Sequence, residues 1–220
     1  MWFLSSRKNR RSNSAPARPR TRPCLEMLED RCVPSAGQLD PTFGSGGVVV
    51  TNVNPLDSFS HVVIQPDGKV LAIGPSTTKN YFHQSILIRY TTSGALDSTF
   101  GSGGILTTSN GYTQVALQAD GKIVIAGGAN VSADHQVEFE LARFNANGTV
   151  DKTFGNKGTV TTPFSGGNCN GASGNALAIQ SDGKIIVAGN TAGTSNAATV
   201  WALARYNANG SLDTTFGSGG

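Results

Sequence analysis

The chain has 220 residues, of which 28 are glycine, 7% are aromatic and 14% are charged. Its apolar content of 38% is too high for disorder throughout, and its length is sufficient for a core in one or two domains. The formal charge of +3 is uneven: residues 1–35 hold eight Lys or Arg against three acids, and the rest hold nine against eleven. The body of the chain therefore lacks the basic surface that nucleic-acid binding requires.

Residues 1–36 are predicted to form a disordered basic arm, because Ser, Pro, Arg and Asn dominate residues 1–22. The few apolar residues at its start precede the basic run, which is the reverse of a secretory signal. No stretch approaches the ~18 apolar residues of a membrane span. Three cysteines cannot all pair within one chain and show no zinc-site spacing, so neither a disulfide framework nor a metal site is predicted for Cys24, Cys32 and Cys169.

The end of this arm carries a short motif, Arg22-Pro-Cys-Leu-Glu-Met-Leu-Glu-Asp-Arg-Cys-Val-Pro-Ser35. It resembles the N-terminal motif found ahead of predicted extracellular proteins of planctomycete bacteria. The resemblance implies a sorting or surface-attachment role, and hence an extracellular or cell-surface location. The alternative for the basic run is a solvated tail, and nucleic-acid binding is disfavoured because no aromatic residues are interleaved with the arginines.

Residues 37–220 are organised by a motif that occurs four times, with Leu or Val, then Asp-x-Thr-Phe-Gly. Its aspartates are 57, 54 and 62 residues apart, at Asp40, Asp97, Asp151 and Asp213. Such a period indicates a repeat architecture. The predicted repeats are residues 37–93, 94–147 and 148–209, with the start of a fourth at 210–220.

Each repeat is predicted to contain four short strands. The first strands are 48–53, 105–108 and 159–162, and the second are 60–65, 113–118 and 175–180. The third are 69–74, 122–127 and 184–189, and the fourth are 85–90, 138–144 and 200–206. Asp-Gly between the second and third strands predicts hairpins with type I′ turns.

The third strands are nearly continuous in apolar residues and must be covered on both faces. Antiparallel four-stranded units of this kind suit stacked propeller blades. We therefore predict an all-β fold, an incomplete β-propeller of about three four-stranded antiparallel blades, with a disordered N-terminal arm. A β-solenoid is the alternative, although its coils are usually shorter and lack Asp-Gly hairpins.

The recurring Leu-Asp-x-Thr-Phe-Gly-x-Gly-Gly, Gln-x-Asp-Gly-Lys-Ile and Ala-Leu-Ala-Arg-Tyr-Asn-x-x-Gly segments resemble the delta-60 repeats of bacterial surface proteins. The resemblance covers essentially all of residues 37–220 and implies a propeller-like fold without a general catalytic site. Such proteins usually carry many repeats, whereas this chain has three. It is therefore either a fragment of a longer repeat protein, half of a closed six-blade ring formed with a second copy through open blade edges, or an open arc.

Antiparallel order places the Asp-Gly turns and the Asp-x-Thr-Phe-Gly motif at one end of the strands and the variable loops at the other. The variable loops are 75–84, 128–137 and 190–199, with 54–59, 109–112 and 163–174. Scaffolds vary their binding loops, so we expect any ligand at this variable end, which contains Tyr81, His83, Asp134, His135, Asn168 and Cys169.

The repeated polar residues have two readings each. The motif aspartate could bind calcium, but one carboxylate per motif is few, so an Asx-type turn is favoured. The repeated arginine (Arg89, Arg143, Arg205) could bind an anion, but pairing with that aspartate, tying one blade to the next, is favoured. The motif phenylalanine is predicted to plug the core.

The sequence favours a non-enzymatic extracellular or cell-surface repeat scaffold that binds proteins or glycans. The alternatives are a hydrolase-like or lactonase-like propeller enzyme, which would need a central funnel lined by acids or histidines, and a fragment without activity of its own. No catalytic, cofactor-binding or metal-ligating residue is assigned, and no cofactor, nucleic-acid partner or membrane span is expected.

Overall fold

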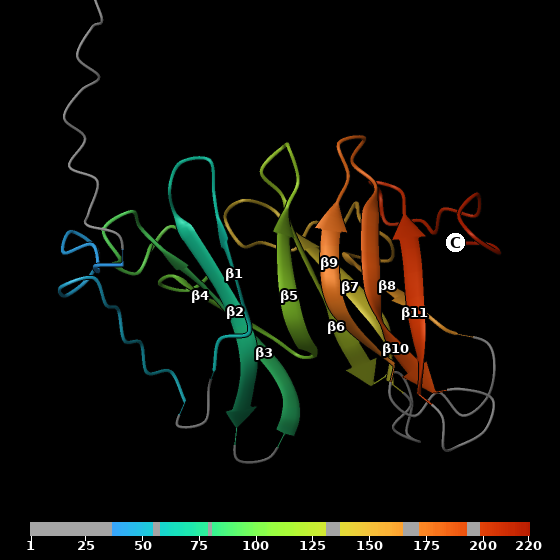
Figure 1. Cartoon of the computed structure of the whole chain (residues 1–220), viewed down its shortest axis with the longest axis horizontal. Helices are drawn as coiled ribbons and strands as arrows, with labels where there is room; N and C mark the ends of the chain where they lie inside the picture. Colours follow the sequence, from blue (N-terminus) through green and yellow to red (C-terminus); the bar gives the residue numbers. More distant parts are fainter. Residues whose placement is uncertain (1–36, 55–57, 79–80, 131–136, 165–171, 193–198) are drawn as a thin grey trace, which may run out of the picture. The chain divides into compact units, whose positions relative to one another are not determined.

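The computed structural model describes residues 37–54, 58–78, 81–130, 137–164, 172–192 and 199–220. The chain divides into two units, Met1–Gln38 and Leu39–Gly220, and everything that follows concerns the second. The described residues contain eleven strands in three antiparallel sheets (Figure 1). The three antiparallel sheets confirm the predicted all-β fold. No helix long and apolar enough to cross a membrane occurs among the described residues.

The strands follow one another along each sheet in chain order. Sheet 1 contains β1 (His61–Ile64), β2 (Val70–Thr78), β3 (Tyr81–Tyr90) and β4 (Ile105–Thr108). Sheet 2 contains β5 (Gly111–Leu117), β6 (Ile123–Asn130), β7 (Val137–Phe144) and β8 (Thr159–Thr162). Sheet 3 contains β9 (Ser173–Ile179), β10 (Ile185–Ala192) and β11 (Thr199–Tyr206).

The grouping of strands into blades differs from the prediction. The first strands of the second and third predicted repeats pair with the last strand of the repeat before them, so β4 joins β3 and β8 joins β7. Sheets 1 and 2 are therefore built across a predicted repeat boundary, whereas sheet 3 lies within the third predicted repeat. The physical reason is that the motif between them is a compact turn that returns the chain to the edge of the strand it has just left.

The predicted strand 48–53 is not a strand in the structure. Its counterparts β4 and β8 each pair with a preceding strand, whereas this segment makes only the isolated bridge between Ser45 and Val48. A strand needs a partner for its backbone groups, and no described strand pairs with this segment. Val49 nevertheless packs on sheet 1 beside Ile86, Ile88 and Tyr90.

The Asp-Gly turns are hairpins, but the predicted type I′ geometry is wrong. Gly68 has a φ of 80°, whereas Asp67 is not among the residues with positive φ. The amide of Gly68 donates to Gln65 O, and Gln65 N donates to Lys69 O. The loop therefore has three residues, a turn closed by one left-handed glycine. The turns at Gly121 and Gly183 have the same bonds.

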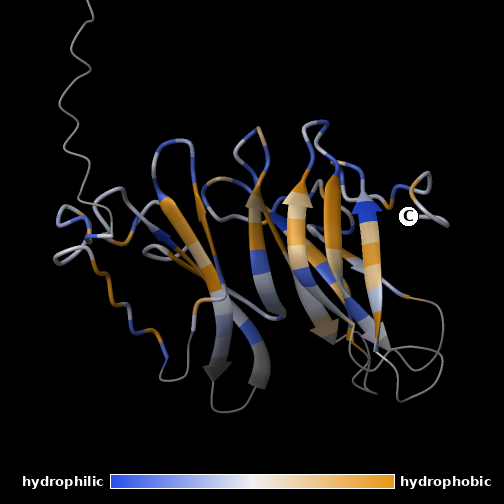
Figure 2. Cartoon of the chain, viewed as in Figure 1, coloured by the Kyte–Doolittle hydropathy of each residue, from blue (hydrophilic) through white to orange (hydrophobic). Residues whose placement is uncertain are grey.

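The apolar core lies between neighbouring sheets, where Figure 2 shows the apolar residues concentrated along the strands. Leu71, Ile73 and Leu87 of sheet 1 form one buried cluster with Ile123 and Ile125 of sheet 2. A second buried cluster joins sheets 2 and 3. The middle sheet is thus covered on both faces, as its continuously apolar third strand requires.

A glycine near the middle of β2, β6 and β10 lets the neighbouring strand approach closely. A Cβ atom on Gly127 would lie 2.2 Å from Gly111 O, and one on Gly189 would lie 1.9 Å from Ser173 O. Both positions adjoin a shift in strand register. Glycine at such a bulge is needed for space rather than for a positive φ.

Candidate functional site

The motif aspartates form the Asx-type turns that the sequence predicts. Oδ1 of Asp97 accepts hydrogen bonds from the Thr99 amide (3.1 Å) and from its hydroxyl (2.6 Å). The same two bonds recur at Asp151 and Asp213 and, at the first copy, at Asp40. One carboxylate oxygen of each motif is therefore occupied by its own turn.

The second oxygen of the aspartate pairs with two cations. In sheet 2, Oδ2 of Asp151 lies 2.9 Å from Arg143 Nε and 3.2 Å from Lys122 Nζ. The Thr153 hydroxyl and amide, together with both cations, hold the pKa of the Asp151 carboxyl well below its usual range. Asp97 and Asp213 have the same arrangement, which confirms the predicted Arg–Asp pairing.

The arginine also ties one sheet to the next. Arg143 Nη1 donates to Ala208 O (2.6 Å), in the turn that follows β11, and its guanidinium lies 4.6 Å from the centroid of the Phe154 ring. Arg89 makes the equivalent bond to Ala146 O. Phe100 and Phe154 are fully buried, as predicted, whereas the motif phenylalanines at the two ends of the repeat region, Phe43 and Phe216, are half-buried. At Asp97, Asp151 and Asp213 these internal contacts engage both carboxylate oxygens, which disfavours a calcium ion at these three copies of the motif.

A buried polar group in sheet 2 was not found from the sequence. Glu140 of β7 is buried and accepts a hydrogen bond from the Asn110 side-chain amide, and the Tyr112 hydroxyl faces the same carboxylate. Burial raises the pKa of the Glu140 carboxyl, and burial also raises the pKa of Tyr112. The only sequence signal is that Ile86 and Ala202 stand at the aligned positions of the other repeats.

Most residues proposed for the variable end fall outside the description of the structure. Asp134, His135, Asn168 and Cys169 lie in segments that the structure does not describe, and for Tyr81 and His83 only the backbone is described. Cys24 and Cys32 also lie outside the described residues. The structure does support the division into two ends, since antiparallel pairing places all three Asp-Gly turns together, as the upper loops of Figure 1 show.

The described residues contain no cluster of metal-ligating side chains: no three His, Cys, Asp or Glu side chains among them come together in a way that could hold a metal ion. The one histidine whose side chain is described, His61, accepts the Val115 amide at Nδ1 (3.3 Å). This bond joins the first strands of sheets 1 and 2 and gives His61 a structural contact.

A family model for a β-propeller, described as a domain of unknown function (DUF5122), matches residues 65–100, 118–154 and 180–216. The chain belongs to the DUF5122 β-propeller family. Each matched DUF5122 segment begins at the glutamine before an Asp-Gly turn and ends at the motif phenylalanine of the following copy. No curated protein matches the chain.

The matched DUF5122 segments show what the repeat unit is. Each contains the hairpin turn, the two long strands, the variable loop between them and the Asp-x-Thr-Phe motif with its arginine. The three copies thus share the hairpin turn and the Arg–Asp pair, while the variable loop differs in sequence from copy to copy.

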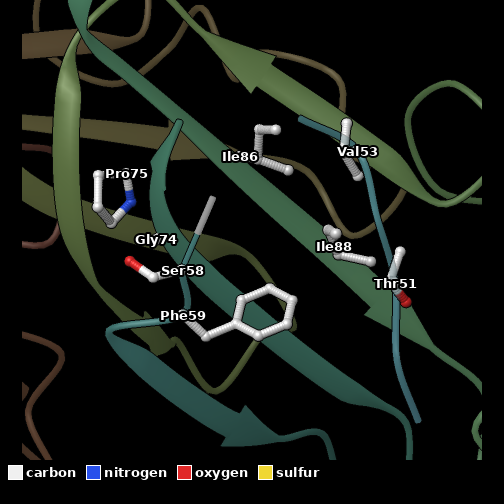
Figure 3. A pocket seen from close by; sticks show the side chains of 8 residues that line it. All are labelled: Thr51, Val53, Ser58, Phe59, Gly74, Pro75, Ile86 and Ile88. Atoms are coloured by element: carbon white, nitrogen blue, oxygen red, sulfur yellow. The ribbon is translucent and has the colours of Figure 1, made fainter. Parts of the chain in front are cut away.

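A shallow apolar cavity lies on the face of sheet 1 that points away from sheet 2. It has about 320 Å³ of empty space, including its open mouth. Figure 3 shows its wall, formed by Ile86 and Ile88 of β3, Gly74 of β2, Phe59, and the segment with Thr51 and Val53. At the other end of the molecule, Trp201 of β11 is 96% exposed.

Proposed function

We propose that this DUF5122 β-propeller is a non-enzymatic scaffold that binds proteins or glycans at the cell surface through its variable end. The observation that carries the proposal is the contrast between the two ends of the strands. At one end the same turns and the same Arg–Asp–Lys ties recur in every sheet. At the other end the loops differ in sequence, and those at 54–59, 109–112 and 163–174 also differ in length, which is the pattern of a rigid scaffold that presents variable loops.

We call the end with the Asp-Gly turns and the Asp-x-Thr-Phe-Gly motif the uniform end. Its charged groups support this assignment of roles. Asp97, Asp151 and Asp213 each accept bonds from a threonine and pair with an arginine and a lysine. A ligand at this end would have to compete with these internal contacts. The extracellular location rests on the resemblance of residues 22–35 to a sorting motif.

Binding is tested with the full chain, fluorescently labelled, on an array of microbial and plant polysaccharides and on whole bacterial cells. Two variants are compared. In the first, a Gly-Ser linker replaces residues 131–136, which connect β6 to β7; in the second, Asp120→Asn changes an exposed residue of the Asp-Gly turn at the opposite end. We expect the loop replacement to lose binding to the glycan or cell surface and Asp120→Asn to keep it. If neither the loop replacement nor equivalent changes in the other variable loops weakens binding, the variable-end proposal is wrong.

Location is tested separately by fractionating the cells that express the full chain and by probing intact cells with protease. We expect the chain in the surface or extracellular fraction and sensitive to protease before lysis. Recovery only in the cytoplasm, protected until lysis, would contradict the proposed location without bearing on the fold.

A further inference from the structure

The two contacts between neighbouring sheets follow one pattern. On the leading side, Leu87 or Leu141 packs into the next sheet, and Arg89 or Arg143 donates to a turn carbonyl of the next repeat. A backbone bond accompanies them, from Gly101 N to Asn147 O and from Gly155 N to Asn209 O, each 3.0 Å. Sheets 1 and 2 therefore each contact the next sheet through a buried leucine, an arginine side chain and a backbone amide.

An aromatic contact completes the pattern between sheets 2 and 3. Phe139 of β7 is buried and lies against Gly189 of β10, where an added Cβ would be 2.9 Å from its ring. Thr162 of β8 bonds Tyr206 of sheet 3 through their hydroxyls (2.6 Å). The aromatic ring thus fills the space above a central-strand glycine, beside the segment that contains the threonine.

Sheet 3 presents the same groups, and the described residues leave them exposed. Trp201 aligns with Phe139 and is 96% exposed, and Leu203 aligns with Leu141 and is 49% exposed. Among the described residues β11 forms the edge of its sheet, at the side where β7 pairs with β8. We call this surface, Trp201 and Leu203 with the free edge of β11, the Trp201 face.

Sheet 1 presents the complementary groups on its open side. Its cavity lies above Gly74, the counterpart of Gly189, beside Thr51 (Figure 3). Tyr90 bonds Thr51 (2.8 Å) as Tyr206 bonds Thr162. On the same side, Val62 and Ile64 are 56% and 69% exposed. We call this surface, the cavity with Val62 and Ile64, the Gly74 face.

We propose that the Trp201 face of one chain binds the Gly74 face of a second copy, and that two chains close into a ring of six sheets. Trp201 enters the cavity above Gly74, and Arg205 donates to Thr92 O of the second copy, the counterpart of Ala146 O and Ala208 O. Residues 48–51 of the second copy pair with β11 in the register of β7 and β8, with Val49 opposite Leu203. Six sheets lie within the four to eight blades of closed propellers.

One rearrangement accompanies closure. Residues 40–47 of the second copy occupy the turn that residues 213–220 would contact, since Gly44 N donates to Ser93 O (2.9 Å). The two copies of the motif compete for this place. Asp213 is held by Arg205, Lys184 and Thr215, whereas the recorded bonds of Asp40 are to Thr42. Residues 40–47 are therefore the ones that leave.

The ring is tested on the full chain by light scattering behind a sizing column, between 1 and about 100 μM. We expect twice the 22.8 kDa of one chain, with loss of the pair in Leu203→Asp and in Val62→Asp. Val150→Asp is the matched control, because Val150 is 46% exposed and lies on neither face. Far-UV circular dichroism of dilute samples checks that every variant is folded.

Two further readouts separate this contact from other associations. Mixing Leu203→Asp with Val62→Asp restores a pair, because one intact Trp201 face then meets one intact Gly74 face. In a Trp2→Phe background, Trp201 fluorescence shifts to the blue as the pair forms. A single-chain mass at every concentration, masses that grow without limit, or a pair that survives both Asp variants would overturn the proposal. Each of these outcomes leaves ligand binding at the variable end open.

Discussion

Replacing Asp151 with Asn tests whether the Arg–Asp–Lys tie stabilises the stack of sheets. The amide keeps the turn, because its oxygen can still accept from Thr153, but the negative charge opposite Arg143 and Lys122 is lost. Removing one partner of a fully buried ion pair costs about 3–5 kcal/mol. Lys122 is 30% exposed, so solvent reaches this cluster, and we expect a loss of about 2–3 kcal/mol in unfolding free energy. For this chain length that lowers Tm by roughly 5–10 °C.

The matched control is Asp40→Asn, the same substitution in the first copy of the motif. Asp40 is exposed, and its described bonds are to Thr42, so we expect no measurable change. Urea unfolding of both variants, followed by far-UV circular dichroism at pH 7, measures the difference. Equal effects at the two positions would show that the ion pair does not carry the stability we assign to it.

The pH dependence of the Asp151→Asn effect provides a second check. The folded pKa of Asp151 lies below its unfolded value of 3.8, so the stabilisation is fully present above that value and is lost as the pH falls toward the folded pKa. The gap between wild type and variant should therefore be full at pH 7 and narrower at pH 3. A gap that is unchanged between these pH values would refute the reasoning.

Three further predictions concern close packing and buried polar groups. Gly127→Ala should lower the unfolding free energy by about 1–3 kcal/mol through overpacking. Gly111→Ala should leave it unchanged in the same urea assay, because a Cβ atom at Gly111 would lie 3.7 Å from its nearest neighbour. Equal losses would contradict the role we give to glycine at the bulge. Burial raises the folded pKa of Glu140, so the wild-type protein loses stability as the pH rises above the pKa of the unfolded chain. We therefore expect Glu140→Gln to melt at a higher temperature than wild type at pH 8, with a smaller gain at pH 4. A gain in Tm that is the same at both pH values would refute this. Tyr206→Phe should lose about 1 kcal/mol of unfolding free energy, because its hydrogen bond to Thr162 is lost. Burial raises the pKa of Tyr206 to about 12, so the variant should show a smaller decline in stability between pH 10 and 12 than wild type. An identical decline would show that this phenol does not titrate as described.

The parts of the fold that sequence predicted are those fixed by local pattern. The apolar run of β6 needed cover on both faces, and sheets 1 and 3 provide it. The Asx turn at Asp97 follows from an aspartate two residues before a threonine amide, which is a short-range contact. The pairing of Arg89 with Asp97 could be predicted because both residues recur at fixed positions.

The parts that sequence missed depend on what lies beside a segment. Residues 48–53 have the same pattern as β4, but a strand exists only where a neighbour can pair with it. The assignment of β4 to sheet 1 depends on the turn that returns the chain to β3, which a period-2 pattern does not encode. The type I′ prediction assumed a two-residue loop, whereas pairing of Gln65 with Lys69 sets the loop at three.

The candidate site shows the same division. The uniform end could be predicted, because repetition pointed to its residues and the geometry confirms their ties. Glu140 could not, since it occurs in one repeat only and its meaning depends on Asn110 and Tyr112 lying beside it. The complementarity of the Trp201 and Gly74 faces likewise appears only when equivalent positions in the three sheets are compared in space.

The central claim is that three sheets pack on one another through repeated contacts of the Asp-x-Thr-Phe-Gly motif. Amide hydrogen exchange of Gly101 and Gly155, measured by NMR, tests it most directly, because both amides donate across the boundary between sheets. We predict that both exchange as slowly as the core amides of β6 and β7, through unfolding of the whole stack. Exchange at the rate of an unprotected peptide would show that the sheets do not pack in this way.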